Sequence, residues 1–286
     1  MAVTYKDNKL TTRQLGLLGF KEHPFRSSAD PRFLYLSRDH QYVLSRLEDL
    51  INWREGLAAV EGGIGTGKTS LARRLYELTL QDDENAVPYY INTAAFTTPY
   101  DAAHGIARAF GVPGRRSYTD QLDSLEKFLL ELRGQDRTAV LILDDAQFMA
   151  PVALDAIQNM LNFDLNEKLI QIILFGQQEI RNNFAQKPAV NERVIHWQTL
   201  PPLPYDEMIA MISWRMTVAG RSEPMFTDEA LNLLYDFSGG VPRPLVVVCG
   251  TVLRILASER KTEAGRNEVV EAIQHFKQRP ESETDE

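Results

Sequence analysis

The sequence of 286 residues contains one cysteine, Cys249. A single thiol excludes an intramolecular disulfide framework and fits a reducing compartment. The beginning of the chain lacks the apolar run of a signal peptide, because basic residues interrupt it at Lys6, Lys9 and Arg13. The most apolar stretch, 245–257, contains an arginine and is shorter than the ~20 residues that span a bilayer. We therefore expect a cytoplasmic protein with no membrane partner.

An excess of basic residues is also lacking: the sequence contains 31 Lys and Arg and 39 Asp and Glu, which gives a net charge of -8. This balance argues against a protein that coats nucleic acid with its whole surface, but it leaves room for a local basic groove. Part of the acidity lies at the end of the chain, where we expect an acidic disordered tail at 278–286. The length allows one large or two modest domains.

Short apolar runs alternate with helical patterns through the first two thirds of the chain. The runs at 57–61, 88–92, 138–144 and 170–175 predict buried strands, and the spacing at 68–80, 100–110, 120–132 and 152–161 predicts helices. This alternation is typical of an α/β fold, in which helices cover both faces of a parallel sheet. We expect an N-terminal segment, 1–55, that leads into an α/β nucleotide-binding domain at 56–203.

The pattern changes at a cluster of prolines, Pro201, Pro202 and Pro204, which predicts a domain boundary. Beyond it, residues 205–219, 227–237, 242–257 and 266–276 have helical spacing. Thr227 is expected to cap one of these helices, and the following pair of glycines to end it. The sequence therefore predicts a small all-helical domain at 204–277.

A Gly-rich loop lies between the first predicted strand and its helix. It matches the GxxxxGK[ST] pattern with Gly62, Gly63, Ile64, Gly65, Thr66, Gly67, Lys68 and Thr69, followed by Ser70. Backbone N–H groups in such a loop face phosphates, the lysine reaches the β- and γ-phosphates, and the Thr69 hydroxyl binds Mg²⁺. The alternative is a turn that merely joins strand to helix. The strand before the loop and the helix after it favour a site for ATP and Mg²⁺, and we assign all nine residues to that site.

Two carboxylates, Asp144 and Asp145, end the apolar strand at 138–144. They could simply cap a helix and form a turn. Together with the Gly-rich loop, however, they predict the acidic strand end of an ATPase site. Asp144 would hold Mg²⁺ through water, and Asp145 stands where such ATPases usually have a glutamate that orients the attacking water. Aspartate is shorter by one methylene, and a misplacement of ~1 Å can cost ~100-fold in rate. We therefore hypothesise slow hydrolysis and a long-lived ATP-bound state.

These motifs resemble those of the ExeA-like AAA+ ATPases. The resemblance covers roughly residues 15–258, and the segments that carry it are 19–25, 29–35, 62–70, 143–147, 174–179 and 239–244. The group is similar to TnsC, MuB and TniB, the ATPases that regulate target selection in bacterial transposons. It implies a P-loop AAA+ fold with a helical lid, self-assembly into rings or filaments on double-stranded DNA, and recruitment of a transposase.

The resemblance also assigns further residues. Gln177 matches the sensor I position and would contact the γ-phosphate or the attacking water. The alternative is a solvated loop glutamine, and the adjacent Gln178 is a second candidate for the role. Arg243 matches sensor II; a cation at a helix start needs an anionic partner, which supports contact with phosphate. Phe25, with Arg26 and Tyr35, would wrap the adenine, although aromatic rings beside turns are more often core.

Arg193 stands where the family carries its arginine finger, the side chain that reaches into a neighbouring subunit's site. The alternatives are a surface ion pair of Arg193 with Glu192, or Arg181 in the role instead. If Arg193 holds this role, ATP hydrolysis requires oligomerisation.

Residues that would contact DNA follow the 88–92 strand in the relatives. Here that region contains Thr97 and, after a helix, Arg115 and Arg116 between a glycine and a serine. Arginines in such a loop suit phosphate contacts, which position a protein without reading sequence. The alternative is a solvated loop between helices. Binding of this kind should be sensitive to salt and nearly independent of sequence.

The resemblance implies an ATP-dependent, DNA-binding regulator of transposition that assembles on target DNA and recruits a transposase or a TniQ-like adaptor. Two alternatives remain open. One is a secretion-associated ATPase like ExeA itself, against which the lack of a long apolar run counts. The other is a scaffold that assembles with ATP and scarcely hydrolyses it, an alternative that the shorter Asp145 makes reasonable.

Overall fold

The computed structural model describes residues 10–26, 30–82, 85–164 and 167–278, and the chain divides into two compact units. We call residues 38–201 the sheet unit, and residues 1–37 with 202–286 the helical unit. The segment expected to lead as a whole into the sheet, 1–55, is divided between them at residue 37. The acidic tail lies outside the described residues from 279 onward.

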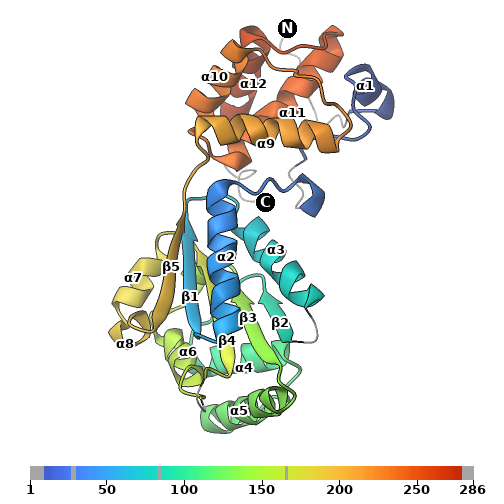
Figure 1. The fold of residues 1–286 in the computed structure, drawn as a ribbon. Coiled ribbons are helices and arrows are strands. Elements are labelled where there is room, and N and C mark those ends of the chain that lie inside the picture. Colours follow the sequence, from blue (N-terminus) through green and yellow to red (C-terminus); the bar gives the residue numbers. More distant parts are fainter. Residues whose placement is uncertain (1–9, 27–29, 83–84, 165–166, 279–286) are drawn as a thin grey trace. The chain divides into compact units, whose positions relative to one another are not determined.

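The sheet unit contains a five-stranded parallel sheet in the order β2-β3-β4-β1-β5 (Figure 1). The strands are β1 (Leu57–Gly62), β2 (Ala86–Ile91), β3 (Thr138–Leu143), β4 (Ile170–Gly176) and β5 (Val194–Leu200). Every residue of β1, β3 and β4 is buried, as expected for continuous apolar runs at the centre of a covered parallel sheet. The predicted α/β P-loop fold is confirmed. The fifth strand was not predicted, because β5 is a half-exposed edge strand with polar residues in it.

Helices cover both faces of this sheet (Figure 1). On one face lie α2 (Arg38–Trp53) and α3 (Lys68–Gln81), and on the other α4 (Pro99–Ala109), α5 (Tyr118–Gly134) and α6 (Leu154–Met160). Short 3-10 turns, η2 (Ala146–Phe148) and η3 (Pro151–Ala153), follow β3, and α7 (Ile180–Ala185) and α8 (Pro188–Asn191) join β4 to β5. Leucines such as Leu125 and Leu129 are fully buried, each contributing about 1.5–3 kcal/mol by the apolar area it buries.

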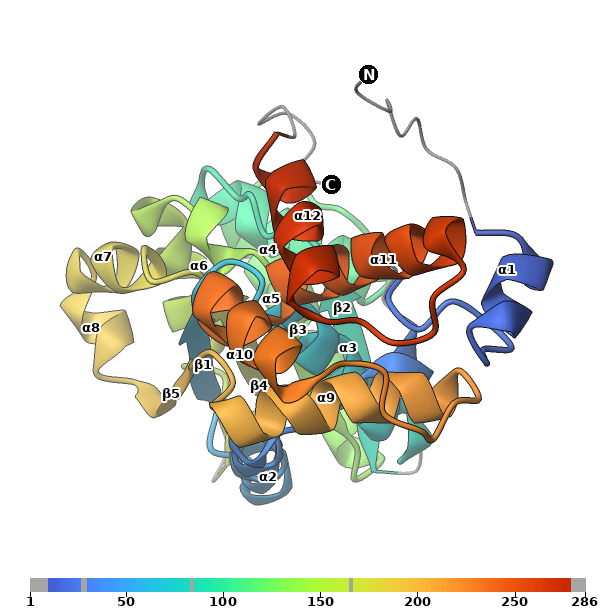
Figure 2. The same cartoon turned by 90° about the horizontal axis from the view of Figure 1, so that it is seen from above.

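The helical unit consists of α1 (Thr12–Leu17), the 3-10 turn η1 (Pro31–Phe33), α9 (Tyr205–Val218), α10 (Asp228–Ser238), α11 (Pro242–Glu259) and α12 (Arg266–Lys277). Helix α11 packs against α10 and α12 (Figure 2). The predicted cap is present: the Thr227 side chain accepts a hydrogen bond from the backbone N–H of Ala230, and Gly239 ends α10 in the left-handed conformation. Among the described helices, none is both long and apolar enough to cross a membrane.

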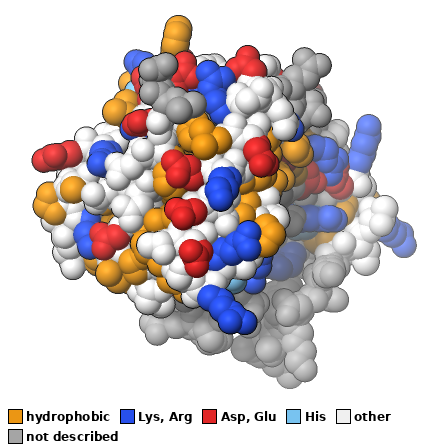
Figure 3. Space-filling model, turned by 90° about the horizontal axis from the view of Figure 1, so that it is seen from below, with side chains coloured by type: hydrophobic (Ala, Val, Ile, Leu, Met, Phe, Trp, Pro, Cys, Tyr) orange, Lys and Arg blue, Asp and Glu red, His pale blue; other side chains and the backbone are white. Residues whose placement is uncertain are grey.

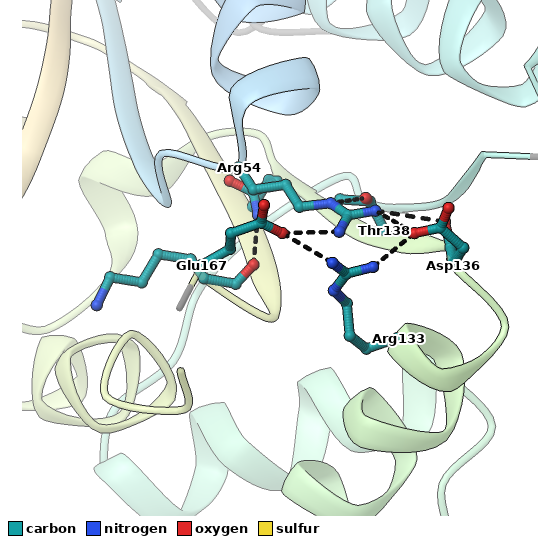
Figure 4. A network of polar contacts seen from close by, with 7 residues as sticks. Arg54, Arg133, Asp136, Thr138 and Glu167 are labelled. Atoms are coloured by element: carbon teal, nitrogen blue, oxygen red, sulfur yellow. Dashed lines mark hydrogen bonds and ion pairs between the residues drawn. The ribbon is translucent and has the colours of Figure 1, made fainter. Parts of the chain in front are cut away.

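A charged network ties together the amino ends of the central strands (Figure 4). Glu167, just before β4, accepts hydrogen bonds from Arg54 at 2.8 Å and from Arg133 at 3.0 Å. Arg54 also donates to the Thr138 hydroxyl at 2.9 Å, and both arginines contact Asp136. The network joins the ends of α2 and α5 to the starts of β3 and β4. It therefore fixes the edge of the sheet opposite the Gly-rich loop.

Candidate functional site

The Gly-rich loop connects the carboxyl end of β1 to the first residue of α3. Gly65 and Gly67 have φ values of 78° and 104°, a conformation that side-chain-bearing residues rarely adopt. A Cβ atom on Gly62 would lie 2.8 Å from the Leu200 carbonyl oxygen, so only glycine fits between β1 and β5. The Thr66 hydroxyl donates a hydrogen bond to the Gly63 carbonyl at 3.0 Å. The loop therefore has the strand-loop-helix setting that the sequence predicts.

Lys68 lies folded along this loop. Its Nζ donates hydrogen bonds to the carbonyl oxygens of Gly62 at 2.9 Å and Gly63 at 2.8 Å, and the residue is 8% exposed. Burial lowers the pKa of Lys68, and the nearby carboxylates of Asp144, Asp145 and Glu179 counteract that effect. The ammonium group thus lies between the loop that would hold phosphates and the acidic end of β3.

Asp144 is buried at the end of β3, with 1% of its surface exposed. Burial raises the pKa of Asp144, while hydrogen bonds from the side chains of Tyr90 and Thr69 and from the backbone N–H of Asp145 act in the opposite direction. Tyr90 donates to Oδ2 at 2.8 Å, and the Asp145 N–H donates to Oδ1 at 3.0 Å. The Asp144 carboxylate and the Thr69 hydroxyl are hard oxygen donors, the type that Mg²⁺ prefers. This donor set fits Mg²⁺, which supplies positive charge next to bound phosphates.

Asp145 is one of the few residues other than glycine with positive φ, at 51°. Aspartate and asparagine tolerate this left-handed conformation better than most residues, which gives a backbone reason for aspartate at this position. Its Oδ1 accepts a hydrogen bond from the side-chain amide of Gln147 at 3.0 Å. The oxygen of the same Gln147 amide accepts the backbone N–H of Gln177 at 3.0 Å. One side chain therefore joins the predicted water-orienting residue to the predicted sensor.

An ion pair with a buried carboxylate lies directly before the loop. Glu61 is 5% exposed, and its carboxylate accepts hydrogen bonds from Arg181 Nε at 2.6 Å and Nη2 at 2.7 Å, and from Thr199 at 3.0 Å. Burial would raise the pKa of Glu61, but the hydrogen bonds from Arg181 and Thr199 and the charge of Arg181 lower it overall. The Arg181 guanidinium lies 4.6 Å from the centre of the Trp197 ring. This pair connects α7, which follows Gln177, to the last strand residue before Gly62.

Comparison with known proteins agrees with this geometry. Residues 52–184, which include the loop, Asp144, Asp145 and Gln177, match the family model of the AAA domain. The chain contains an AAA domain. General secretion pathway protein A of Aeromonas hydrophila is 30% identical over 240 residues, which are 82% of this chain and 43% of that protein. The chain thus spans less than half the length of this curated relative. An AAA domain indicates nucleotide-hydrolysing ATPase activity.

Solved structures share the fold at low identity. The Aeropyrum pernix ORC2 protein, solved as ADPNP–ADP complexes, has a TM-score of 0.67 at 17% identity, and the similarity covers 92% of this chain and 74% of that one. The structure of Drosophila ORC bound to DNA gives a TM-score of 0.67 at 17% identity, covering 99% and 74% of the two chains. At this identity the similarity establishes the fold alone.

The remaining residues predicted to bind nucleotide belong to the helical unit, outside the matched AAA domain. Phe25 is 4% exposed and packs edge-on against Phe226, with 6.3 Å between ring centres. Its burial argues against the expected stacking on adenine, because neighbouring core residues already cover the ring. Arg243 lies exposed in the first turn of α11. Its predicted contact with phosphate stays a prediction.

Arg193 lies between α8 and β5 in the sheet unit, and its Nη1 donates to the carbonyl oxygen of Gln158 at 2.9 Å. It does not pair with its neighbour Glu192 in any contact of the described residues. Arg181, the alternative finger, is held by Glu61 but keeps 53% of its side chain exposed. Both arginines therefore have contacts within the chain, and the role of Arg193 stays a prediction.

Thr97, Arg115 and Arg116 all lie exposed on the sheet unit. The Tyr100 hydroxyl at the start of α4 donates to the Arg115 carbonyl, which brings the segment after β2 next to the loop before α5. Arg115 Nε donates to the Ser124 hydroxyl at 2.8 Å, and its backbone N–H donates to the buried Gln121 amide at 2.7 Å. We call Thr97, Tyr100, Arg115 and Arg116 the α4–α5 surface.

The sequence reasoning missed three residues of this site: Tyr90, Gln147 and Glu61. Tyr90 is half-buried in β2, and pattern alone does not show that its hydroxyl crosses to Asp144 in β3. Gln147 had a signal, since it stands two residues after Asp145 within a motif that carries the resemblance, but its amide contacts depend on β4. Glu61 is a carboxylate at the end of an apolar run, which could have predicted a buried ion pair.

Proposed function

We propose that this protein is an ATP-dependent, DNA-binding regulator of DNA transposition that oligomerises on target DNA and recruits a transposase or a TniQ-like adaptor. The observation that supports its DNA-binding part is the hydrogen bond from Tyr100 to the Arg115 carbonyl, which brings the start of α4 beside the exposed loop of Arg115 and Arg116 on the unit that holds the P-loop. DNA contacts there would lie in the same body as the nucleotide. Binding of ATP and binding of DNA can then favour one another.

In this proposal the residues around the loop bind and orient ATP. The loop amides and Lys68 hold the phosphates, and Thr69 and Asp144 hold Mg²⁺. Asp145 and Gln177 orient the attacking water. Arg193 from a neighbouring subunit would stabilise charge on the transferred phosphoryl group, so that turnover requires an oligomer. The short Asp145 side chain makes us expect slow hydrolysis.

Contact with DNA would be made by a small surface repeated in each subunit. Acidic and basic side chains alternate over the face drawn in Figure 3, which favours local contacts over a broad basic face. Repetition in an oligomer multiplies a few contacts with phosphates into firm binding. The fold shared with an ORC assembly solved on DNA is consistent with this arrangement.

The experiment that tests the proposal is binding to duplex DNA with ATP, with ADP and without nucleotide, followed by electron microscopy. We expect rings or filaments on DNA of unrelated sequences with ATP alone, and none for Lys68→Ala. Addition of a transposase and a TniQ-like adaptor should then give a larger complex on the DNA. Absence of DNA association under every nucleotide and salt condition would overturn the proposal.

A secretion-associated ATPase is the second candidate, favoured by the 30% identity to general secretion pathway protein A. It predicts ATP-dependent assembly with no response to DNA, so the same experiment separates the two. A weakly hydrolysing scaffold predicts assembly with ATP and almost no release of phosphate. Turnover measured on assembled protein, with and without DNA, distinguishes a scaffold from a slow ATPase.

A further inference from the structure

Gln147 is the residue that connects the two ends of the hydrolytic site. Its amide nitrogen donates to Asp145 Oδ1 at 3.0 Å, and its amide oxygen accepts the N–H of Gln177 at 3.0 Å. Asp145 follows β3, and Gln177 follows β4, the neighbouring strand of the sheet. A side-chain amide has both a donor and an acceptor, so it can donate to a carboxylate and accept from a backbone N–H at the same time.

The surrounding structure holds this amide in place. Asn183 in α7 donates to the backbone carbonyls of Gln147 at 3.2 Å and Met149 at 3.0 Å, which fixes the 3-10 turn η2 against α7. A Cβ atom on Gly176 would lie 3.3 Å from both the backbone nitrogen and the side-chain oxygen of Gln147. The glycine at the end of β4 therefore leaves the room in which the amide lies.

The position of Asp145 also needs support from the residues around it. Its backbone has φ 51°, a conformation that residues other than glycine adopt at a cost and that the surrounding contacts must maintain. The carboxylates of Asp145, Asp144 and Glu179 lie near Lys68, so a freed Asp145 side chain has an alternative partner in that ammonium group. The bond from Gln147 to Asp145 Oδ1 competes with this alternative.

We infer that Gln147 is a positioning residue for ATP hydrolysis, which sets Asp145 and Gln177 at a fixed separation on either side of the attacking water. The inference rests on the proposed roles of Asp145 and Gln177 in hydrolysis. Gln147 does not touch the reacting atoms; it acts through the two residues that do. Because placement of a water is critical to geometry, loss of this amide should lower kcat by about 10- to 100-fold, with little change in affinity for ATP.

Two variants separate the two hydrogen bonds. Gln147→Met has a similar length and loses both bonds. Gln147→Glu keeps an oxygen that accepts the Gln177 N–H, but it loses the donor to Asp145 and adds a negative charge beside it. We expect both to lower kcat while the Kd for ATP, measured at equilibrium by calorimetry, stays within about twofold. Gln186→Ala, an exposed glutamine at the end of α7, is the matched control with unchanged kcat.

Hydrogen exchange gives a readout that does not depend on turnover. The Gln177 amide should exchange faster in Gln147→Met than in the wild type, and at the wild-type rate in Gln147→Glu, since only the methionine removes its acceptor. The inference is overturned if Gln147→Met leaves kcat and the exchange at Gln177 unchanged. It is equally overturned if the loss of kcat comes with weakened ATP binding and a lowered unfolding temperature, because that pattern belongs to a purely structural role.

Failure of the proposed ATPase chemistry has a different signature. In that case the wild-type protein shows no ATP turnover, either with or without DNA. This measurement is made before any variant is compared. Asp145→Asn must abolish turnover in parallel, since Gln147 acts through that carboxylate. Wild-type turnover that survives in Asp145→Asn removes the hydrolytic role of Asp145 and the inference with it, while ATP-dependent assembly on DNA would still stand.

Discussion

The hydroxyl of Tyr90 in β2 donates a hydrogen bond to Oδ2 of Asp144, the residue directly after β3, at 2.8 Å. The bond orients a buried carboxylate that, with Thr69, would hold Mg²⁺. Side chains that orient metal ligands in this way typically contribute 10- to 100-fold to metal affinity or activity. Tyr90 thus belongs to the site through the carboxylate that it orients.

Tyr90→Phe removes this hydroxyl and keeps the ring. We expect the concentration of Mg²⁺ that gives half-maximal turnover to rise about tenfold, because the Asp144 carboxylate loses one of its fixed donors. Titration of turnover with Mg²⁺ at saturating ATP measures this shift. Tyr89→Phe in the same strand is the control, since the Tyr89 ring packs against Phe110 on the apolar side. Equal requirements for Mg²⁺ in the two variants would contradict the assignment.

Arg193 can be tested by mixing two inactive proteins. Asp145→Asn keeps Arg193, and Arg193→Ala keeps Asp145, so a mixed oligomer contains interfaces in which both groups are intact. Random mixing in equal amounts should restore about a quarter of the wild-type turnover, because roughly one interface in four pairs the two intact groups. No recovery, together with normal oligomers in each protein, would show that Arg193 serves its own chain through the bond to Gln158.

Arg116 is exposed on the α4–α5 surface, and we predict that it contacts a DNA phosphate. Arg116→Ala should weaken binding to all duplexes alike and reduce the slope of log affinity against log salt by about 0.9. Lys127→Ala, an exposed cation on α5, is the control that should leave the slope unchanged. A slope that is the same in the wild type and in Arg116→Ala would remove Arg116 from the interface.

His23 makes the stability of the helical unit depend on pH. Burial lowers its pKa from 6.5 to about 4, with further contributions from the charges of Arg26, Arg254 and Arg215, and Nδ1 accepts the Phe25 N–H at 3.1 Å. The unfolded chain therefore binds a proton at His23 over a range in which the folded chain does not, and stability should fall as pH drops from 6.5 to about 4.

The variant His23→Asn keeps an acceptor for the Phe25 N–H and removes the titration. Its unfolding free energy, measured by denaturant titration across this range, should depend less steeply on pH than that of the wild type. The difference in slope should correspond to at most one proton taken up on unfolding. Parallel profiles for the two proteins would mean that another group is responsible.

Gly240 should tolerate substitution far less than its neighbour Gly239. Both have positive φ, at 78° and 56°, but a Cβ atom on Gly240 would lie 1.9 Å from the Leu203 carbonyl oxygen, while Gly239 has nothing within 4 Å. We expect Gly239→Ala to cost about 1 kcal/mol for the left-handed backbone, and Gly240→Ala several times as much. Thermal unfolding of both variants checks this difference, and similar losses would contradict it.

Much of the fold could be predicted because its signals are local. Central strands such as β3 and β4 appear as continuous apolar runs. The Gly-rich loop is recognised by the spacing of its glycines, lysine and threonine between a strand and a helix. The edge strand β5 could not be found in this way, since a half-exposed strand without an apolar run resembles a loop. The same limit applies to Phe25, whose aromatic character suits both a ligand contact and a core position.

By itself, the sequence determined that residues 62–70 join a strand to a helix and that Asp144 and Asp145 follow a buried strand, because these features depend on residue types at fixed spacing along one chain. Only the tertiary structure decided what surrounds them. Tyr90 reaches Asp144, Gln147 joins Asp145 to Gln177, and Arg181 covers Glu61 across the sheet. These contacts join residues that lie on separate strands, turns and helices. The register and packing among these elements follow from the cooperative burial of the whole sheet, which no local pattern contains.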